Sequence, residues 1–212
     1  METAADYLKR TESAVRKLFE GIESYLERLQ HAVPPVFVSS GANRQQADVE
    51  LEAWKKRHDA EIKASLAAQR EYFAESFALA TLCGSVLQVA AKALEQYSTN
   101  TAVPEEWAPV VKAKHARYCV GGPVRRVPLG LVILAGRNQH MHFGEAQLWE
   151  PNLTVFDRLA IYHDRNPDPA VRDPAFDLGN PRLVSFAHNI TALIGWRSFD
   201  NYQRDLRELL EQ

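Results

Sequence analysis

The sequence predicts an all-α protein on three observations. Apolar residues recur at helical spacing over most of the chain, and helix-favouring Ala, Leu, Glu, Arg and Gln are abundant. Gly and Pro number only 10 and 11 among 212 residues. Hydrophobic residues make up 46% of the chain and charged residues 25%, the composition of a soluble globular protein that can bury a core.

The first expected helix spans about Thr3–Ala32, and Val33-Pro34-Pro35 ends it because proline lacks an amide donor. The second helical stretch runs over about Gln45–Tyr97. Unbroken, it would be about 75 Å long, so we expect a bend or break within Asp59–Gln69. Its charged outer part, Val49–Leu66, is expected to form an antiparallel hairpin with the first helix, or alternatively a coiled-coil arm.

The middle of the chain predicts two more helices. One begins near Pro104 and reaches about Tyr118, where Gly121-Gly122-Pro123 follows as a break. The run Val127–Ala135 is apolar and β-branched, so a buried strand is one interpretation. We favour a buried helix, because helices flank the run and no partner strand is obvious.

The last third predicts further helix and one long loop. Phe143–Glu150 is expected to continue as helix, and Pro151 to begin a helix that reaches His163. Asp164–Pro181 contains four prolines and a glycine among charged residues, which predicts a surface loop without regular structure. A final helix is expected over Leu183–Leu210.

Several classes of protein are disfavoured by composition. No apolar run reaches the roughly 18 residues that a membrane span needs, and the N-terminus lacks the features of a signal peptide, so we expect a cytoplasmic protein. Cys83 is expected to be a small buried hydrophobe, and the only other cysteine, Cys119, has no partner at metal-ligand spacing. We therefore expect neither a metal site nor a cofactor.

A polar segment, Gly136–Glu145, follows the most apolar run of the chain. It places Arg137, Asn138, His140 and His142 within six residues. Polar groups at the end of a buried element cost free energy unless they are satisfied or used. On a helix Asn138 and His142 share one face, so the amide can orient the imidazole, whereas Arg137 lies off that face.

The segment Arg137-Asn138-Gln139-His140-Met141-His142 resembles the Arg-x4-6-His motif of HEPN (higher eukaryotes and prokaryotes nucleotide-binding) domains, in which Asn often follows the Arg. The resemblance covers the chain from about Ala68 onward, so residues 1–67 are expected to be an N-terminal hairpin on a HEPN-like core, 68–212, within a single α-helical domain. It implies a helical bundle that forms a homodimer, with two motifs facing each other across a composite active site. It also implies a metal-independent endoribonuclease, of a family in which toxins with antitoxin partners and phage-defence effectors are common.

The chemistry of RNA cleavage fits these residues. Attack of a 2′-hydroxyl on the neighbouring phosphorus leaves a 2′,3′-cyclic phosphate and needs proton transfer near neutral pH, which histidine supplies. We expect His142 to transfer the proton, Arg137 to bind the scissile phosphate and Asn138 to position one of them. His140 is expected either to contact RNA or, two positions from His142, to point elsewhere.

A net charge of −2 requires that any contact with a phosphate backbone come from a local basic patch. Arg117, Arg125 and Arg126 are the substrate-binding candidates, beside Lys112, Lys114 and His115. A solvated helix face plus loop charges is the alternative interpretation.

Three rival functions stay open from sequence. A HEPN-type module can bind nucleotides, RNA or proteins without catalysis. A structural motif would use Arg137 and Asn138 to cap a helix and the histidines to satisfy buried carbonyls. A metal hydrolase is the weakest rival, because His140 and His142 are not spaced for one helix face and no HExxH-type set occurs.

Overall fold

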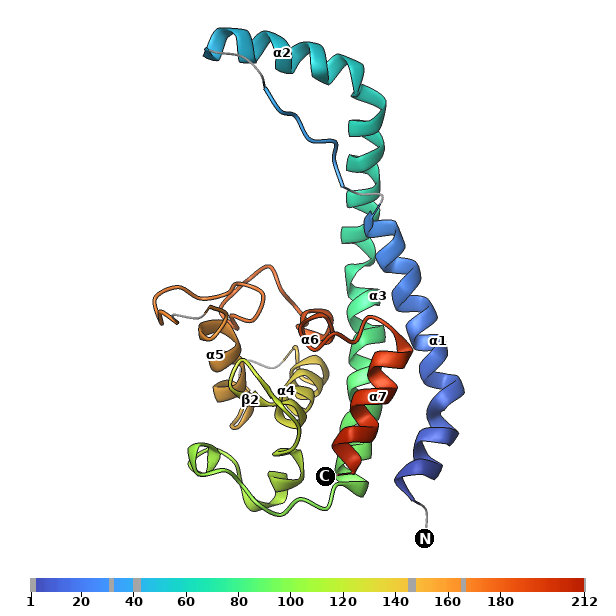
Figure 1. Ribbon diagram of the computed structural model, residues 1–212, viewed down its shortest axis with the longest axis vertical. Coiled ribbons are helices and arrows are strands. Elements are labelled where there is room, and N and C mark those ends of the chain that lie inside the picture. The colour runs from blue at the N-terminus through green and yellow to red at the C-terminus, as the bar shows by residue number, and fades with distance from the viewer. Residues whose placement is uncertain (1–2, 31–32, 40–42, 145–147, 165–166, 212) are drawn as a thin grey trace. The chain divides into compact units, whose positions relative to one another are not determined.

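A computed structural model describes residues 3–30, 33–39, 43–144, 148–164 and 167–211. In these residues the chain is mostly helical, which confirms the all-α prediction (Figure 1). The two strands that occur there have two residues each and form one antiparallel hairpin. The elements in order are α1 (Ala4–Gln30), α2 (Arg44–Arg57), α3 (Asp59–Tyr97), η1 (Glu105–Trp107), η2 (Ala113–Tyr118), β1 (Pro123–Val124), β2 (Val127–Pro128), α4 (Leu129–Met141), α5 (Asn152–Ile161), α6 (Ala187–Leu193) and α7 (Phe199–Leu210).

The chain divides into two compact units, each of which takes part of α1 and of α3. The smaller unit is Glu23–Ser76, and the larger contains the chain up to Ile22 and from Phe77 onward. This division differs from the expected boundary after residue 67. The first half of α1 belongs with the larger unit because Val15 and Phe19 are among its buried core side chains.

The long helical stretch breaks at His58, one residue before the window in which a break was expected. His58 leaves helical geometry (φ −104°, ψ 17°) while its amide still bonds the Trp54 carbonyl at 3.0 Å. Within the larger unit α1 contacts both α3 and α7: Tyr7 donates to the Val89 carbonyl at 3.1 Å, and the Phe19 ring lies against those of Phe199 and Tyr202. The charged segment Val49–Leu66, which was expected to form the hairpin with α1, is divided at His58. Its first part lies in α2, which buries no residue, and its second part lies in α3.

The prediction of one helix from near Pro104 to about Tyr118 is wrong. The chain forms two short 3-10 segments there, η1 and η2. Pro109 lies between them, and proline can neither donate the helical hydrogen bond nor leave its predecessor in helical geometry easily.

The helical interpretation of the apolar run is confirmed from Leu129 onward, where α4 begins and buries five consecutive side chains, Leu131, Val132, Ile133, Leu134 and Ala135. The two residues before it, Val127 and Pro128, form β2 instead. The tight turn of that hairpin holds Arg125 and Arg126 at positive φ (47° and 65°), as a two-residue turn of type I′ requires.

Two more helix predictions were wrong in extent. The helix expected over Phe143–Glu150 does not form at 143–144 or 148–150, and its remaining residues lie outside the described ranges. The last expected helix is two helices, α6 and α7. Gly195 lies between them at φ +75°, a left-handed conformation that ends helices, and Ser198 caps the start of α7 by accepting from the Asn201 amide.

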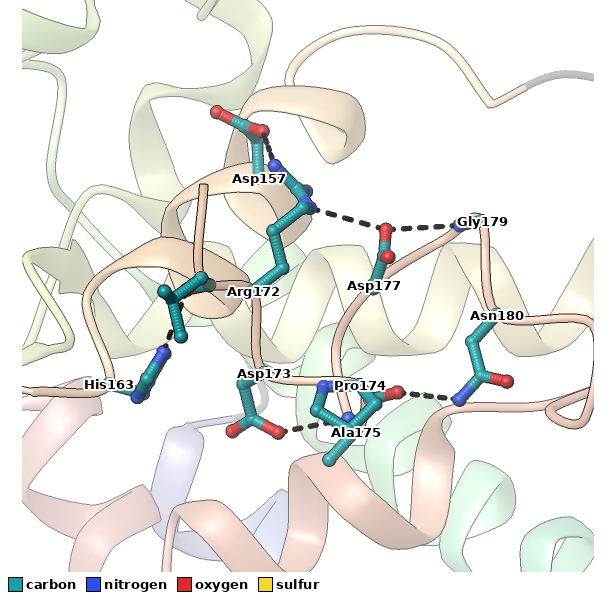
Figure 2. Close-up of polar contacts among 10 residues, drawn as sticks. Asp157, His163, Arg172, Asp173, Pro174, Ala175, Asp177, Gly179 and Asn180 are labelled. Atoms are coloured by element: carbon teal, nitrogen blue, oxygen red, sulfur yellow. Dashed lines mark hydrogen bonds and ion pairs between the residues drawn. The ribbon is translucent and has the colours of Figure 1, made fainter. Parts of the chain in front are cut away.

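The loop prediction is confirmed: the described residues of Asp164–Pro181 form turns without helix or strand. Polar contacts hold them in place, as Figure 2 shows. Arg172 pairs with Asp157 of α5 at 2.8 Å and with Asp177 at 3.3 Å, and the same carboxylate accepts the Gly179 amide.

One described helical segment, Ala74–Tyr97, is long and apolar enough to span a membrane by length and composition. More than half of its most apolar window, 56%, is buried inside the protein. Burial of that kind is typical of a core helix in a soluble protein, and the segment supplies core residues such as Val86 and Leu87.

His188, a half-buried histidine of α6, predicts that the protein loses stability in acid. Burial, and then the nearby Arg197 charge, lower the pKa of His188 from 6.5 to about 4. The unfolded chain therefore binds this proton first, and the free energy of unfolding should fall as pH drops from 6.5 towards 4. At about 1.4 kcal/mol per pKa unit, the loss from this group is roughly 3 kcal/mol.

Urea unfolding at pH 7, 5.5 and 4 would measure this loss in the free energy of unfolding. The variant His188→Gln should show a weaker dependence of that free energy on pH. His163→Gln, which changes an exposed histidine, is the control and should keep the wild-type profile. Parallel profiles for wild type and His188→Gln would contradict the prediction.

Candidate functional site

The polar end of α4 lies against several other elements because the helix is buried. Gly136, the last of its buried apolar stretch, allows this close packing: a Cβ there would lie 3.0 Å from Leu87 and 3.1 Å from Ile190. The next residues, Arg137 to His142, therefore emerge among α3, α5 and the segment before α6. Their polar groups must find partners there.

Arg137 faces α3 and its own neighbour. Its Nε donates to Gln88 Oε1 at 2.5 Å, and its Nη1 donates to Asn138 Oδ1 at 2.7 Å. The guanidinium thereby fixes which way the Asn138 amide points.

Asn138 continues this chain of hydrogen bonds into α5. Its Nδ2 donates to Oδ1 of Asn152, a residue only 7% exposed at the start of that helix. Gln88, Arg137, Asn138 and Asn152 thus connect α3, α4 and α5 by side chains alone. Such a connected network holds Asn138 in one orientation.

Gln139 and His140 connect α4 to the segment before α6. Buried Gln139 uses both ends of its amide: it donates to the Val184 carbonyl at 3.0 Å and accepts the Phe186 amide at 2.9 Å. His140 Nδ1 lies 2.9 Å from Ser185 Oγ, and burial lowers the pKa of His140. Its ring packs directly on α3, at Gly84.

His142 follows the last residue of α4, and its amide still bonds the Asn138 carbonyl at 3.0 Å. Its side chain is exposed and lines a pocket of about 350 Å³, named here the α4 pocket. The pocket has the size of a site for a small ligand or one nucleotide unit. Its lining residues are Lys112, Lys114, His115, Asn138, His142, Leu148, Trp149, Glu150, Pro151 and Asn152.

Two lysines and two histidines give the α4 pocket a basic lining, and Glu150 is the one carboxylate among its described residues. Glu150 is already used at the start of α5, where it accepts the Thr154 amide at 3.2 Å. Burial lowers the pKa of His115, and the adjacent charges of Lys114 and Lys112 lower it further.

The arginines expected at the substrate have other contacts and do not line the α4 pocket. Arg117 donates to the Glu95 carbonyl. Arg125 donates to the Leu159 carbonyl at 2.6 Å and pairs with Asp173 at 2.7 Å. The Arg126 guanidinium lies 4.3 Å from the centre of the Tyr162 ring. Of the basic residues considered from sequence, the structure brings Lys112, Lys114 and His115 to the motif.

Sequence reasoning missed five lining residues: Leu148, Trp149, Glu150, Pro151 and Asn152. Trp149 is 71% exposed, which is unusual for so large an apolar side chain. The sequence signal for Trp149 was its position just before Glu150-Pro151, which precedes α5. The helix expected through Glu150 obscured that signal, because it made Trp149 one more residue on a helix face.

Metal binding by these residues was also considered. Among the side chains that the structure describes, no group of three or more His, Cys, Asp or Glu is placed to hold a metal ion.

Comparison of the chain with family models, with curated proteins and with solved structures found no match.

The packing of His140 on α3 gives a test of its role. A Cβ on Gly84 would lie 2.1 Å from His140 Cδ2, so Gly84→Ala must displace a ring that Ser185 holds in place. We expect a loss of about 1–3 kcal/mol in the free energy of unfolding, measured by urea denaturation.

Gly122→Ala is the matched control, because nothing lies within 4 Å of a Cβ there. Its stability should stay within about 0.5 kcal/mol of wild type. If Gly84→Ala were as stable as the control, His140 would not be packed on α3 as described.

Proposed function

We propose that this protein is a metal-independent, HEPN-type endoribonuclease that cleaves single-stranded RNA at the α4 pocket. One observation carries the proposal: Asn138 and His142, from the motif, share a pocket with Lys112 and Lys114 from a separate segment. This is a proton-transfer group beside cations that can hold a phosphate. A structural role for the motif alone gives no reason for those lysines to be there.

His142 is the proposed proton-transfer residue. Histidine is the side chain that most readily gains and loses a proton near neutral pH. Exposure at the pocket leaves the imidazole accessible to a substrate, in contrast to His140, which is packed on α3.

The sequence predicted that Arg137 binds the scissile phosphate, but Arg137 is not among the residues that line the α4 pocket. We therefore propose that Arg137 positions Asn138. Its two hydrogen bonds, to Gln88 and to Asn138, orient the amide that lines the pocket. Charge stabilisation of the phosphorane then comes chiefly from Lys112 and Lys114, whose ammonium groups are compact charges on flexible stems.

The exposed indole of Trp149 supports single-stranded RNA as the substrate class. Unpaired bases stack on exposed aromatic rings, and such contacts contribute about 1–3 kcal/mol per base. Trp149 lines the same pocket as the lysines, so a stacked base and its phosphate can be bound together.

The non-catalytic alternative is a HEPN-type module that binds RNA at the same pocket without cleaving it. The homodimer, the antitoxin partner and a role as toxin or phage-defence effector stay predictions of the resemblance. A cytoplasmic location stays a prediction from the sequence. The cleavage experiment below separates catalysis from binding.

Cleavage of a mixed RNA substrate in excess chelator tests the proposal. Wild type should produce 2′,3′-cyclic phosphate ends, and His142→Ala should lower the cleavage rate by about 100-fold or more without loss of stability. His163→Ala, which changes an exposed histidine outside the pocket lining, should cleave like wild type.

If folded wild type binds RNA but leaves it intact, the non-catalytic alternative is correct. If chelator abolishes cleavage, a metal-dependent mechanism replaces this one.

The lysines predict a specific dependence of RNA affinity on salt. Each phosphate contact contributes about 0.7 to the slope of log K against log salt for a single strand. The double variant Lys112→Ala/Lys114→Ala should therefore weaken binding and reduce that slope by about 1.4. Fluorescence anisotropy with a labelled single strand at several salt concentrations would measure both.

Lys17→Ala/Lys63→Ala removes two exposed lysines that do not line the pocket, and should leave the slope unchanged. Equal slopes for the two double variants would show that the lysines of the pocket do not contact phosphate.

A further inference from the structure

The α4 pocket of a single chain is lined by two imidazoles. His142 comes from the end of α4, and His115 comes from η2. The two residues are distant in sequence, so only folding brings them to one pocket. Cleavage by attack of a 2′-hydroxyl needs one group that accepts a proton and another that donates one.

The surroundings of His115 favour a neutral imidazole, the form that can accept a proton. Its side chain is half-buried, and among the residues that the structure describes nothing hydrogen-bonds its buried Nδ1. A buried nitrogen without a partner costs free energy, and a catalytic role is one of the reasons for which proteins retain such an atom.

The charges around His115 favour its neutral form. Burial lowers the pKa of His115 most, followed by Lys114 and Lys112 on its own segment. Across the pocket are His142 from α4 and Glu150 from the segment before α5. Among the lining residues that the structure describes, Glu150 carries the only opposite charge, and it already accepts the Thr154 amide.

We infer that His115 is the general base and His142 the general acid of the cleavage step, so that one chain's pocket holds both proton-transfer groups. This inference rests on the proposed function. It differs from the composite site expected from the resemblance, in which each chain of a dimer supplies one histidine.

The step balances with these two residues. Neutral His115 accepts the proton of the 2′-hydroxyl, and an electron pair of that oxygen forms a bond to phosphorus. The bond from phosphorus to the 5′-oxygen breaks, and its electron pair stays on that oxygen, which takes a proton from protonated His142. The products are a 2′,3′-cyclic phosphate end and a 5′-hydroxyl end. Proton exchange with solvent restores both imidazoles, and nothing is oxidised or reduced.

Cleavage rates of His115 variants give the first test. His115→Asn and His115→Ala should each lower kcat/KM by about 100-fold or more, while thermal unfolding shows that both are folded. His163→Ala is the matched control. Wild-type kcat/KM should decline on the acid side as His115 becomes protonated, and the residual activity of His115→Asn should lack that decline.

Mixing variants shows whether both groups act within one chain. His115→Asn and His142→Ala should keep their low rates when they are mixed, because no single chain then carries both imidazoles. Recovery of activity would mean that the two groups come from different chains and would overturn the inference, as would full activity of His115→Asn. Absence of cleavage by wild type would overturn the proposed function itself.

Phosphate binding supplies a readout that does not depend on cleavage. In NMR titrations of the histidine ring protons, the pKa of His115 should lie below the ordinary 6.5 without ligand and rise when inorganic phosphate is added. Phosphate should leave the His163 signal unchanged. A His115 signal that phosphate does not move would overturn the inference even if wild type cleaves RNA.

Discussion

The structure of the larger unit depends on how a buried helix ends in polar residues. α4 buries its apolar stretch completely, so the side chains that follow must hydrogen-bond to neighbouring elements or lose free energy. Arg137 bonds Gln88 of α3, Asn138 bonds Asn152 of α5, and Gln139 bonds the backbone before α6. Each bond joins α4 to a different element, and together they fix where those elements lie around it.

The α4 pocket is formed where this network reaches the surface. Asn138 is both part of the network and part of the pocket lining, so its amide is presented in a fixed orientation. His142 lies just beyond the helix, where its imidazole is exposed. The basic side of the pocket comes from η2 and Lys112 before it, a segment that Pro109 prevents from continuing as part of a longer helix.

Structural and catalytic interpretations of the motif apply to different residues in it. Gln139 and His140 hold the helix against its neighbours, as a structural interpretation requires. Asn138 and His142 line the pocket, as a catalytic interpretation requires. The contacts of Arg137 are structural, and through its hydrogen bond to Asn138 they also orient an amide that lines the pocket.

The sequence by itself determined the features that depend on local pattern. Helical periodicity predicted the all-α class and the buried helix after Pro128. A spacing of four predicted Asn138 and His142 on one face, and both line the α4 pocket although His142 follows the last residue of α4. Only the tertiary structure decided which cations reach that face. Arg125 pairs with Asp173, 48 residues away, whereas Lys112 and Lys114 line the pocket. Pairing at that separation depends on how elements pack, and periodicity within one element carries no information about it.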